Sequence, residues 1–244
     1  MIVLDRVSST LAAGRLRKCI LDDVSLSLPT DERLAILGHE GAGKSTLIRL
    51  LSGALLPGSG SIRRHARVSF PVGFSGGYRR GLSAYENIAH AAQLYGADVD
   101  EVVNFVSRLT GIDAALDEDY GDLPQHLRVR LVYAVSYAIP FDVYLIDNKV
   151  AVGDQEFRAR CERVYEARMQ EAGCILTTSL SRYARRFGTR IALLTQGKLV
   201  LYDDMERAIH DYERLERPAV AAGISERIAA AAEEAGQSIA LDES

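Results

Sequence analysis

The strongest chemical pattern in the sequence is a run of nine residues that reads Gly38, His39, Glu40, Gly41, Ala42, Gly43, Lys44, Ser45 and Thr46. An apolar run at 34–37 precedes it and another at 47–51 follows, so a buried strand is predicted to turn into a helix here. In such a loop, backbone N–H groups surround phosphate oxygens at a helix N-terminus. Lys44 is expected to neutralise the outer phosphates, and the Ser45 hydroxyl to reach a magnesium ion. A glycine-rich turn that holds no ligand is the alternative interpretation.

Two acidic residues bear on this predicted phosphate site. Asp147 ends the apolar run 143–146, and a carboxylate at the end of a buried strand is the usual second ligand of the magnesium. A cap on the following turn is the alternative role for Asp147. Glu40 places a negative charge inside an anion-binding loop, so it weakens phosphate binding unless it points outward or meets an arginine.

The composition indicates a globular chain in a reducing compartment. Its 244 residues are 48% hydrophobic, which is enough for a substantial core. A net charge of −4 provides no global basic field, so nucleic acid is not an expected partner. Cys19, Cys161 and Cys174 show no metal-ligand spacing. No apolar run approaches the roughly 18 residues that span a bilayer, and the N-terminus does not read as a signal peptide. A cytoplasmic location is expected.

The elements that must position these residues follow from hydrophobic periodicity. Segments 2–7, 24–28 and 33–37 have a β-type pattern, which predicts a short antiparallel start that leads into the strand before the phosphate loop. Residues 83–138 have a helical pattern. Strands and helices then alternate, as a strand at 142–147, a helix at 154–172, a strand at 174–178, a helix at 181–187 and a strand at 191–194. This alternation predicts an α/β fold with a parallel sheet and right-handed crossovers.

The order of these parts resembles the nucleotide-binding subunit of ABC transporters, a branch of the P-loop NTPases. More narrowly, it is similar to the ATP-binding subunits of bacterial capsular polysaccharide exporters. The resemblance covers about residues 1–215, and its local matches are 69–73, Gly76-Gly77, Glu86-Asn87, 94–96, 141–147 and 151–154. It implies an α/β core with an antiparallel β subdomain from residues 1–82 and 139–215, and an inserted helical lobe from 83–138. Residues 216–244 are expected to form a helical extension or a tail.

The resemblance also implies ligands and partners. ATP with Mg²⁺ would be held by residues 38–46, with Ser45 and Asp147 on the metal. The subunit would dimerise with itself or with an intact ATPase subunit, and would act on an integral membrane permease at the inner face of the cell membrane. A groove between the glycine-rich joint at 73–81 and the helical lobe would receive the permease.

Several catalytic positions of that family hold other residues here. The glutamate that polarises the attacking water falls on Asn148, and the histidine that touches the γ-phosphate falls on Ser179. The glutamine that the family has in the glycine-rich joint falls on Arg79. The signature segment falls on 123–128, where Gln125, His126 and Arg128 are the groups that would have to substitute for it.

The place where the family stacks the adenine base, in the N-terminal β region, differs as well. Residues 1–69 contain no Phe, Tyr or Trp, so a stacking partner there would have to be aliphatic or a guanidinium such as that of Arg15 or Arg17. The affinity for the nucleoside part is therefore expected to be lower than is usual in the family.

These features favour a nucleotide-binding subunit of a cell-surface polysaccharide exporter that binds ATP and magnesium but hydrolyses ATP weakly or not at all by itself. The alternative is a catalytically inactive scaffold or regulator of the same fold that acts through protein–protein contacts. A stand-alone kinase or GTPase is disfavoured, because no second substrate site and no base-specificity motif is visible. The sequence leaves open which glycan is exported, whether the dimer is homo- or heteromeric, and whether Arg79, Gln125 or His126 restores hydrolysis.

Overall fold

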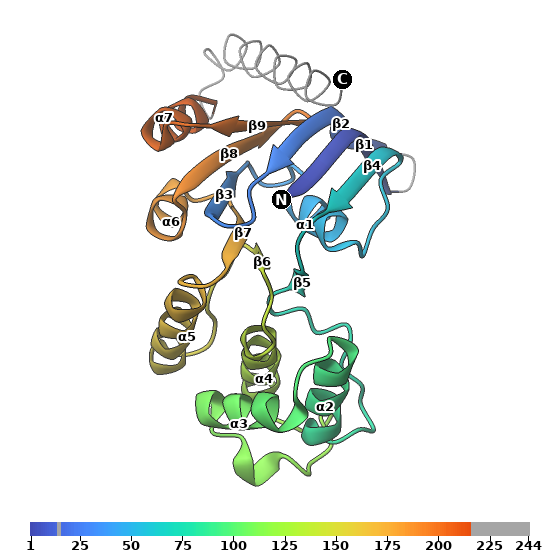
Figure 1. Ribbon diagram of the computed structural model, residues 1–244, viewed down its shortest axis with the longest axis vertical. Helices are drawn as coiled ribbons and strands as arrows, with labels where there is room; N and C mark the ends of the chain where they lie inside the picture. Colours follow the sequence, from blue (N-terminus) through green and yellow to red (C-terminus); the bar gives the residue numbers. More distant parts are fainter. Residues whose placement is uncertain (14–15, 216–244) are drawn as a thin grey trace. The chain divides into compact units, whose positions relative to one another are not determined.

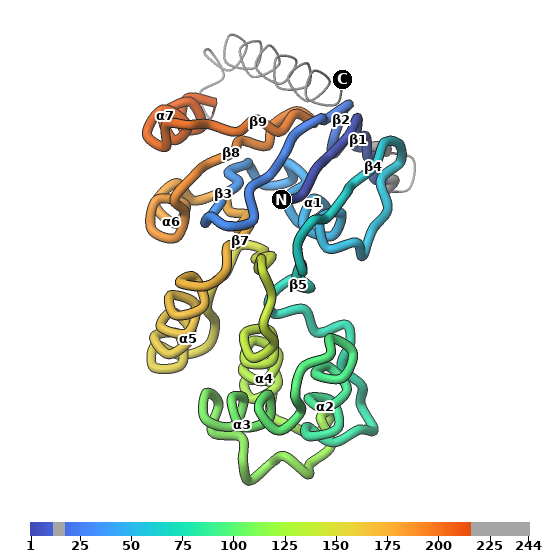
Figure 2. Tube along the Cα trace, in the orientation of Figure 1, coloured from blue at the N-terminus to red at the C-terminus, as the bar shows by residue number. Residues whose placement is uncertain are grey.

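The computed structural model describes residues 1–13 and 16–215, and the predicted C-terminal extension at 216–244 lies outside them. The chain forms two compact units. Unit 1 contains Met1–Val68, Asp142–Asn148 and the segment from Ala172 onward, and unit 2 contains Ser69–Phe141 and Lys149–Glu171. Both the blue beginning and the orange-red end of the trace therefore belong to unit 1 (Figure 2). Unit 2 takes in the glycine-rich joint and a later helix in addition to the predicted helical lobe.

Unit 1 contains a small antiparallel sheet. Its strand order is β2–β1–β4, and the strands are β1 (Ile2–Ala13), β2 (Leu16–Leu28) and β4 (Ser59–Arg64). The predicted antiparallel start is confirmed, but the predicted strands at 2–7 and 24–28 were too short. The backbone pairing of β1 with β2 continues through polar residues after several register shifts. Because these residues do not alternate between apolar and polar, the hydrophobic pattern does not predict that they are in strands.

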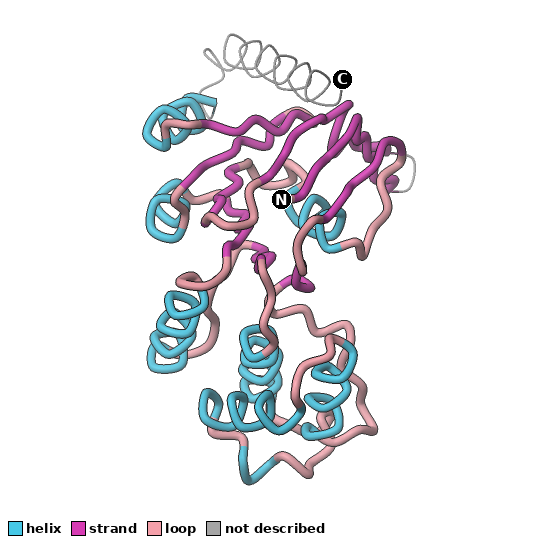
Figure 3. The backbone as a smooth tube through the Cα atoms, in the orientation of Figure 1, coloured by secondary structure: helices cyan, strands magenta, loops and turns pink. Residues whose placement is uncertain are grey.

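A second sheet of unit 1 carries the phosphate loop. Within unit 1, its strands lie in the order β6 (Val143–Asp147), β7 (Gly173–Thr178), β3 (Arg33–Leu37), β8 (Arg190–Thr195) and β9 (Lys198–Tyr202) (Figures 1 and 3). The first four strands are parallel, as predicted, whereas β9 is antiparallel to β8. The predicted parallel arrangement is therefore confirmed for these four strands, and β9 was not predicted. Gln196 and Gly197 both have positive φ, of 49° and 80°, which makes the tight reversal of a two-residue hairpin.

The two faces of β3 face different helices of unit 1. Leu34 and Ile36 belong to one buried apolar cluster with residues of α1 (Lys44–Ser52). Ala35 and Leu37 belong to another with residues of α6 (Ser181–Phe187) and α7 (Met205–Leu215). The limits of α6 agree with the prediction, whereas the sequence analysis missed α7. The strand before the phosphate loop is thus fixed from both sides.

Unit 2 is mostly helical, as predicted for residues 83–138 (Figure 3). Its elements are α2 (Ala84–Leu94), α3 (Val99–Thr110), a short 3₁₀ turn at Asp113–Ala115, α4 (Gln125–Ala138) and α5 (Gln155–Arg168). The strand β5 (Val68–Pro71) begins on the last residue of unit 1 and continues into unit 2. The predicted helix at 154–172 was too long at its C-terminal end, because α5 ends at Arg168.

Within 1–13 and 16–215, no helix combines the length and the apolarity that crossing a membrane requires.

Asn87 fixes the glycine-rich joint within unit 2. Its side chain is only 3% exposed. The amide nitrogen donates to the carbonyls of Arg79, Leu82 and Ser83, and the amide oxygen accepts from the N–H of Arg79. The start of α2 and the end of the joint therefore share one buried side chain.

Asn87→Ala is expected to lower the free energy of unfolding by about 2 to 3 kcal/mol, because several backbone groups lose a buried partner. Urea denaturation measures the change. Asn104→Ala is the matched control, since Asn104 is exposed on α3, and it should stay within about 0.5 kcal/mol of wild type. Equal, small effects of both substitutions would show that the joint does not depend on Asn87.

Candidate functional site

The loop between β3 and α1 has a backbone that only glycine fits at its key positions. Gly41 and Gly43 have φ of 76° and 103°, in the left-handed region. A Cβ atom on Gly43 would lie 2.6 Å from Cγ2 of Ile20, a residue of β2. A Cβ atom on Gly38 would lie 2.8 Å from the carbonyl oxygen of Leu194. The glycines of the motif are therefore required both by their torsion angles and by close neighbours.

Lys44 closes the loop around its own ammonium group. Its Nζ donates to the carbonyl oxygens of Gly38, at 2.7 Å, and of His39, at 2.8 Å. Burial lowers the pKa of Lys44, while the nearby carboxylates of Asp147 and Glu40 act in the opposite direction. Two of the three N–H donors of this lysine thus hold the loop in shape, and a phosphate can take the third.

The start of α1 lies at the end of the loop and has no side-chain cap. Gly43 is its N-cap and supplies no side-chain hydrogen bond, so the first N–H groups of the helix have no side-chain cap. The side chain of Ser45 is exposed in the first turn. Glu40 is exposed as well, and its carboxylate acts on the pKa of Lys44.

Asp147 and Asn148 follow each other at the end of β6. The carboxylate of Asp147 accepts a hydrogen bond from the Thr177 hydroxyl at 2.9 Å, which fixes its orientation. Asn148 is exposed, has φ of 70°, and donates its N–H to the Thr177 carbonyl at 2.8 Å. Asparagine enters this left-handed region readily, whereas most other side chains pay about 1 kcal/mol or more. The backbone at 148 therefore suits the asparagine that is present.

Ser179 lies where the chain leaves β7 for α6. Its carbonyl accepts a hydrogen bond from the Tyr212 hydroxyl at 2.9 Å, and Tyr212 belongs to α7. The ring of Tyr212 also stacks on that of His39, with ring centres 4.9 Å apart and planes at 19°. Ser179 and Tyr212 line a polar hollow of about 590 Å³, together with Leu180, Ser181, Arg182, Arg185 and Glu213. Two predicted site residues are thus joined by a residue that the sequence analysis missed.

The structure places the predicted site residues in both units. Residues 38–46, Asp147, Asn148 and Ser179 all belong to unit 1, whereas Arg79, Gln125, His126 and Arg128 belong to unit 2. The guanidinium of Arg128 donates to the carbonyl of Gly121 at 2.7 Å, within its own unit. Of the two proposed adenine partners, Arg15 lies outside the described residues, and the side chain of Arg17 is not described.

Three residues next to the phosphate loop were not predicted from the sequence, namely Lys18, Ile20 and Tyr212. Ile20 backs Gly43, and Nζ of Lys18 lies 3.0 Å from the position of a Cβ atom on Gly41. The strand pattern of β2 could have indicated that Lys18 and Ile20 share a face, because alternate residues of a strand point the same way. No sequence signal links Tyr212 to His39.

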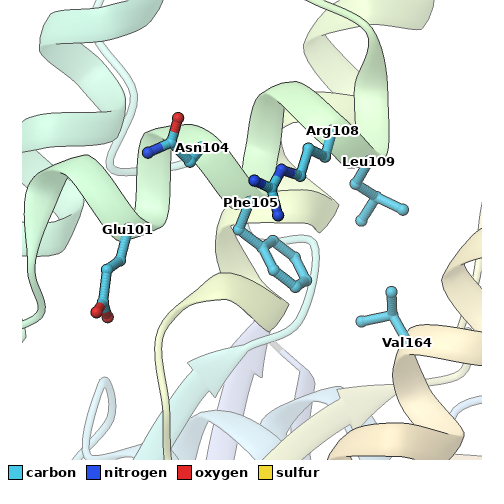
Figure 4. Close-up of a pocket in the computed structure, with 6 residues that line it drawn as sticks. All are labelled: Glu101, Asn104, Phe105, Arg108, Leu109 and Val164. Carbon is cyan, nitrogen blue, oxygen red and sulfur yellow. The ribbon is translucent and has the colours of Figure 1, made fainter.

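A second hollow, of about 540 Å³, lies in unit 2 between α3 and α5 (Figure 4). Phe105 and Leu109 on α3 face Val164 on α5, and Glu101, Asn104 and Arg108 complete the lining. No predicted phosphate or metal residue lines this hollow, so it is separate from the phosphate loop.

The comparison with protein families decides what kind of domain carries this loop. Residues 21–151, more than half of the chain, match the family model described as ABC transporter. The chain belongs to the ABC transporter family. Membership implies nucleotide binding, which is typically assisted by Mg²⁺, and the predicted family resemblance is confirmed.

Named relatives in the ABC transporter family cover most of this chain. The capsule polysaccharide export ATP-binding protein CtrD of Neisseria meningitidis serogroup B is 31% identical over 215 residues, which are 88% of this chain and 100% of CtrD. The ATP-binding protein BexA of Haemophilus influenzae is 32% identical over 82% of this chain and 92% of BexA. The polysialic acid transport ATP-binding protein KpsT of Escherichia coli is 29% identical over 88% of this chain and 99% of KpsT.

Solved ABC structures have the same fold. A dimeric post-hydrolysis structure of the ATP-binding cassette MJ0796, bound to ADP and Pi, has a TM-score of 0.67 and covers 81% of this chain and 95% of its own. The structure of an ATP-binding subunit of an ABC transporter also has a TM-score of 0.67, and covers 94% and 99%. At 18% and 17% identity, these structures show the fold alone. The predicted α/β fold of the ABC-type nucleotide-binding domain is confirmed.

The residues present fit a magnesium nucleotide. The ammonium of Lys44 and the uncapped start of α1 provide donors for phosphate oxygens. The hydroxyl of Ser45 and the carboxylate of Asp147 are oxygen ligands of the type that Mg²⁺ accepts beside phosphate. Asp147 also acts on the pKa of Lys44, so its charge is felt at the loop.

Gly43→Ala is expected to weaken ADP binding at least tenfold, because the new methyl group meets Ile20 and the left-handed backbone becomes strained. Isothermal titration with ADP and Mg²⁺ measures the affinity. Gly77→Ala is the matched control, since a Cβ atom there meets nothing within 4 Å. An unchanged affinity in Gly43→Ala would show that the described loop is not the ADP site.

Proposed function

We propose that this chain is the nucleotide-binding subunit of an ABC exporter for capsular or related cell-surface polysaccharide, and that it binds ATP with Mg²⁺ but hydrolyses ATP weakly or not at all by itself. The observation that carries the nucleotide-binding part is the ammonium of Lys44, held on two loop carbonyls beside the charge of Asp147. The relatives CtrD, BexA and KpsT support the transport part, because their names assign them to capsule export, ATP binding and polysialic acid transport.

Each residue of the loop has a proposed role in holding the nucleotide. Backbone N–H groups of the loop at 38–46 bind phosphate oxygens, and Lys44 neutralises the terminal phosphates. Ser45 and Asp147 hold the magnesium, and the Thr177 hydroxyl keeps the Asp147 carboxylate oriented. When bound, MgATP supplies the phosphoanhydride bond whose cleavage the family uses.

The proposed weak turnover follows from two side chains of unit 1. An amide at Asn148 orients a water molecule but cannot take its proton, and the loss of a positioned base typically costs about 10² to 10⁴ in rate. The hydroxyl of Ser179 is shorter than a histidine and carries no charge. Arg79, Gln125 and His126 are the groups of unit 2 that would have to compensate.

The proposed partners follow from the same relationship. One is a second nucleotide-binding subunit, either a copy of this chain or one with the missing catalytic groups, and the dimeric cassette among the solved structures supports such pairing. The other is an integral membrane permease, which would hold this chain on the cytoplasmic face of the membrane. The joint in unit 2 exposes 52% of Phe74, and α2 exposes 68% of Leu94, so apolar surface is present where the permease contact is proposed.

The purified chain is expected to bind ATP in the presence of Mg²⁺ with little phosphate release. Lys44→Ala should weaken ATP binding about 10- to 100-fold, because a charged hydrogen-bond donor to phosphate is lost. Lys198→Ala is the control, since Lys198 pairs with Asp22 at 3.3 Å on the surface of unit 1. Fast hydrolysis that disappears in Lys44→Ala would contradict the weak turnover. Failure to bind ATP or ADP at millimolar concentration would contradict the nucleotide role itself.

Phe74→Ser is expected to reduce co-purification with the permease severalfold, because an exposed aromatic side chain of the proposed contact is lost. Leu56→Ser is the control, since Leu56 is 83% exposed on unit 1. Equal recovery of the permease with both variants would place its contact elsewhere.

An export assay in cells separates transport from the alternative role as a scaffold. A transport subunit loses polysaccharide export when Lys44 is replaced by Ala. A scaffold that acts through protein contacts alone keeps it.

A further inference from the structure

Tyr212 connects the C-terminal helix of unit 1 to the phosphate loop. It lies on α7, beyond the residues 21–151 that match the ABC transporter model, and it is only 3% exposed. Ala208 and Ile209 of the same helix are buried in one cluster with Leu37, the last residue of β3. Tyr212 is therefore carried by a helix that shares a buried apolar cluster with the end of the strand before the loop.

The first contact of Tyr212 is with His39 in the loop. The two rings are stacked at 4.9 Å, and the carbonyl of His39 is one of the two acceptors that hold Lys44. A stacked aromatic pair contributes to stability beyond the area it buries. The ring of Tyr212 thus restrains the residue whose backbone positions the ammonium.

The second contact of Tyr212 is with the segment after β7. Its hydroxyl donates to the carbonyl of Ser179 at 2.9 Å. Two further pairs tie α6 to α7, namely the Ser181 hydroxyl with Glu213 at 2.7 Å and Arg185 with Glu206 at 2.8 Å. One side chain therefore spans the loop and the position where the family has its γ-phosphate histidine.

We infer that Tyr212 is a positioning residue for nucleotide binding, and that its two ends have separable effects. The ring keeps His39, and through it Lys44, in the shape that binds phosphates common to ADP and ATP. The hydroxyl keeps Ser179 in place and acts only on the additional γ-phosphate of ATP. The second statement rests on the proposed function, which assigns Ser179 to that position.

The test compares Mg²⁺-dependent binding of ADP and of a non-hydrolysable ATP analogue by titration calorimetry. Tyr212→Leu removes the stacked ring and is expected to weaken ADP binding about 3- to 10-fold. Tyr212→Phe keeps the ring, so it should restore ADP binding to within about twofold of wild type while binding the ATP analogue about threefold more weakly.

A double-mutant cycle separates positioning from general loss of packing. His39→Ala removes the same stack from the loop side, leaves the packing of α7 intact, and remains informative if Tyr212→Leu unfolds. It should weaken ADP binding as much as Tyr212→Leu does, and the double variant should be no weaker than either. Tyr202→Phe is the matched control, since that hydroxyl bonds to Asp211 of α7 at 3.2 Å, and should change neither affinity.

The outcomes distinguish the two levels of inference. Wild-type affinity for ADP in both His39→Ala and Tyr212→Leu, or additive losses in the double variant, would overturn the role of Tyr212 and leave nucleotide binding intact. A wild-type chain that binds neither nucleotide would overturn the proposed function, and this role with it.

Discussion

The two hydrogen bonds from the Lys44 ammonium to the carbonyls of Gly38 and His39 are the interaction on which the site depends. The loop can close around this group only because Gly41 and Gly43 take left-handed backbone torsions. Ile20 of the antiparallel sheet presses against Gly43, and Tyr212 of α7 against His39. Segments of unit 1 that are far apart in sequence thus together fix the conformation of the phosphate loop.

Much of this architecture could be predicted from local pattern. The strand, loop and helix around Lys44 follow from hydrophobic runs and glycine spacing, and Asp147 at the end of β6 follows from a buried strand that ends on an acid. The limits of α6 and the parallel direction of β6, β7, β3 and β8 also agree with the prediction. These features are encoded by neighbouring residues, so a single sequence is enough to find them.

The remaining features depend on contacts across the fold or on backbone geometry. The sequence analysis did not predict the reversal at Gln196 and Gly197, or the strand β9 and the helix α7 that follow it. The hydrogen bond from the Thr177 hydroxyl to Asp147 depends on the register that pairs these two residues across β6 and β7. Local sequence pattern does not specify that register. The left-handed backbone torsion at Asn148 likewise cannot be predicted from the sequence, and it explains why asparagine fits at this position.

The division of unit 1 into separate segments has a mechanical consequence. The chain passes between the units after Val68, Phe141, Asn148 and Glu171. Any hinge motion must be absorbed by torsion angles near those bonds. The third crossing immediately follows Asn148, whose N–H is anchored to Thr177, the same residue that orients Asp147. A change of torsion angle at that crossing would therefore act on the peptide that follows Asp147, the proposed magnesium ligand, so a mechanical joint and a chemical group lie in adjacent residues.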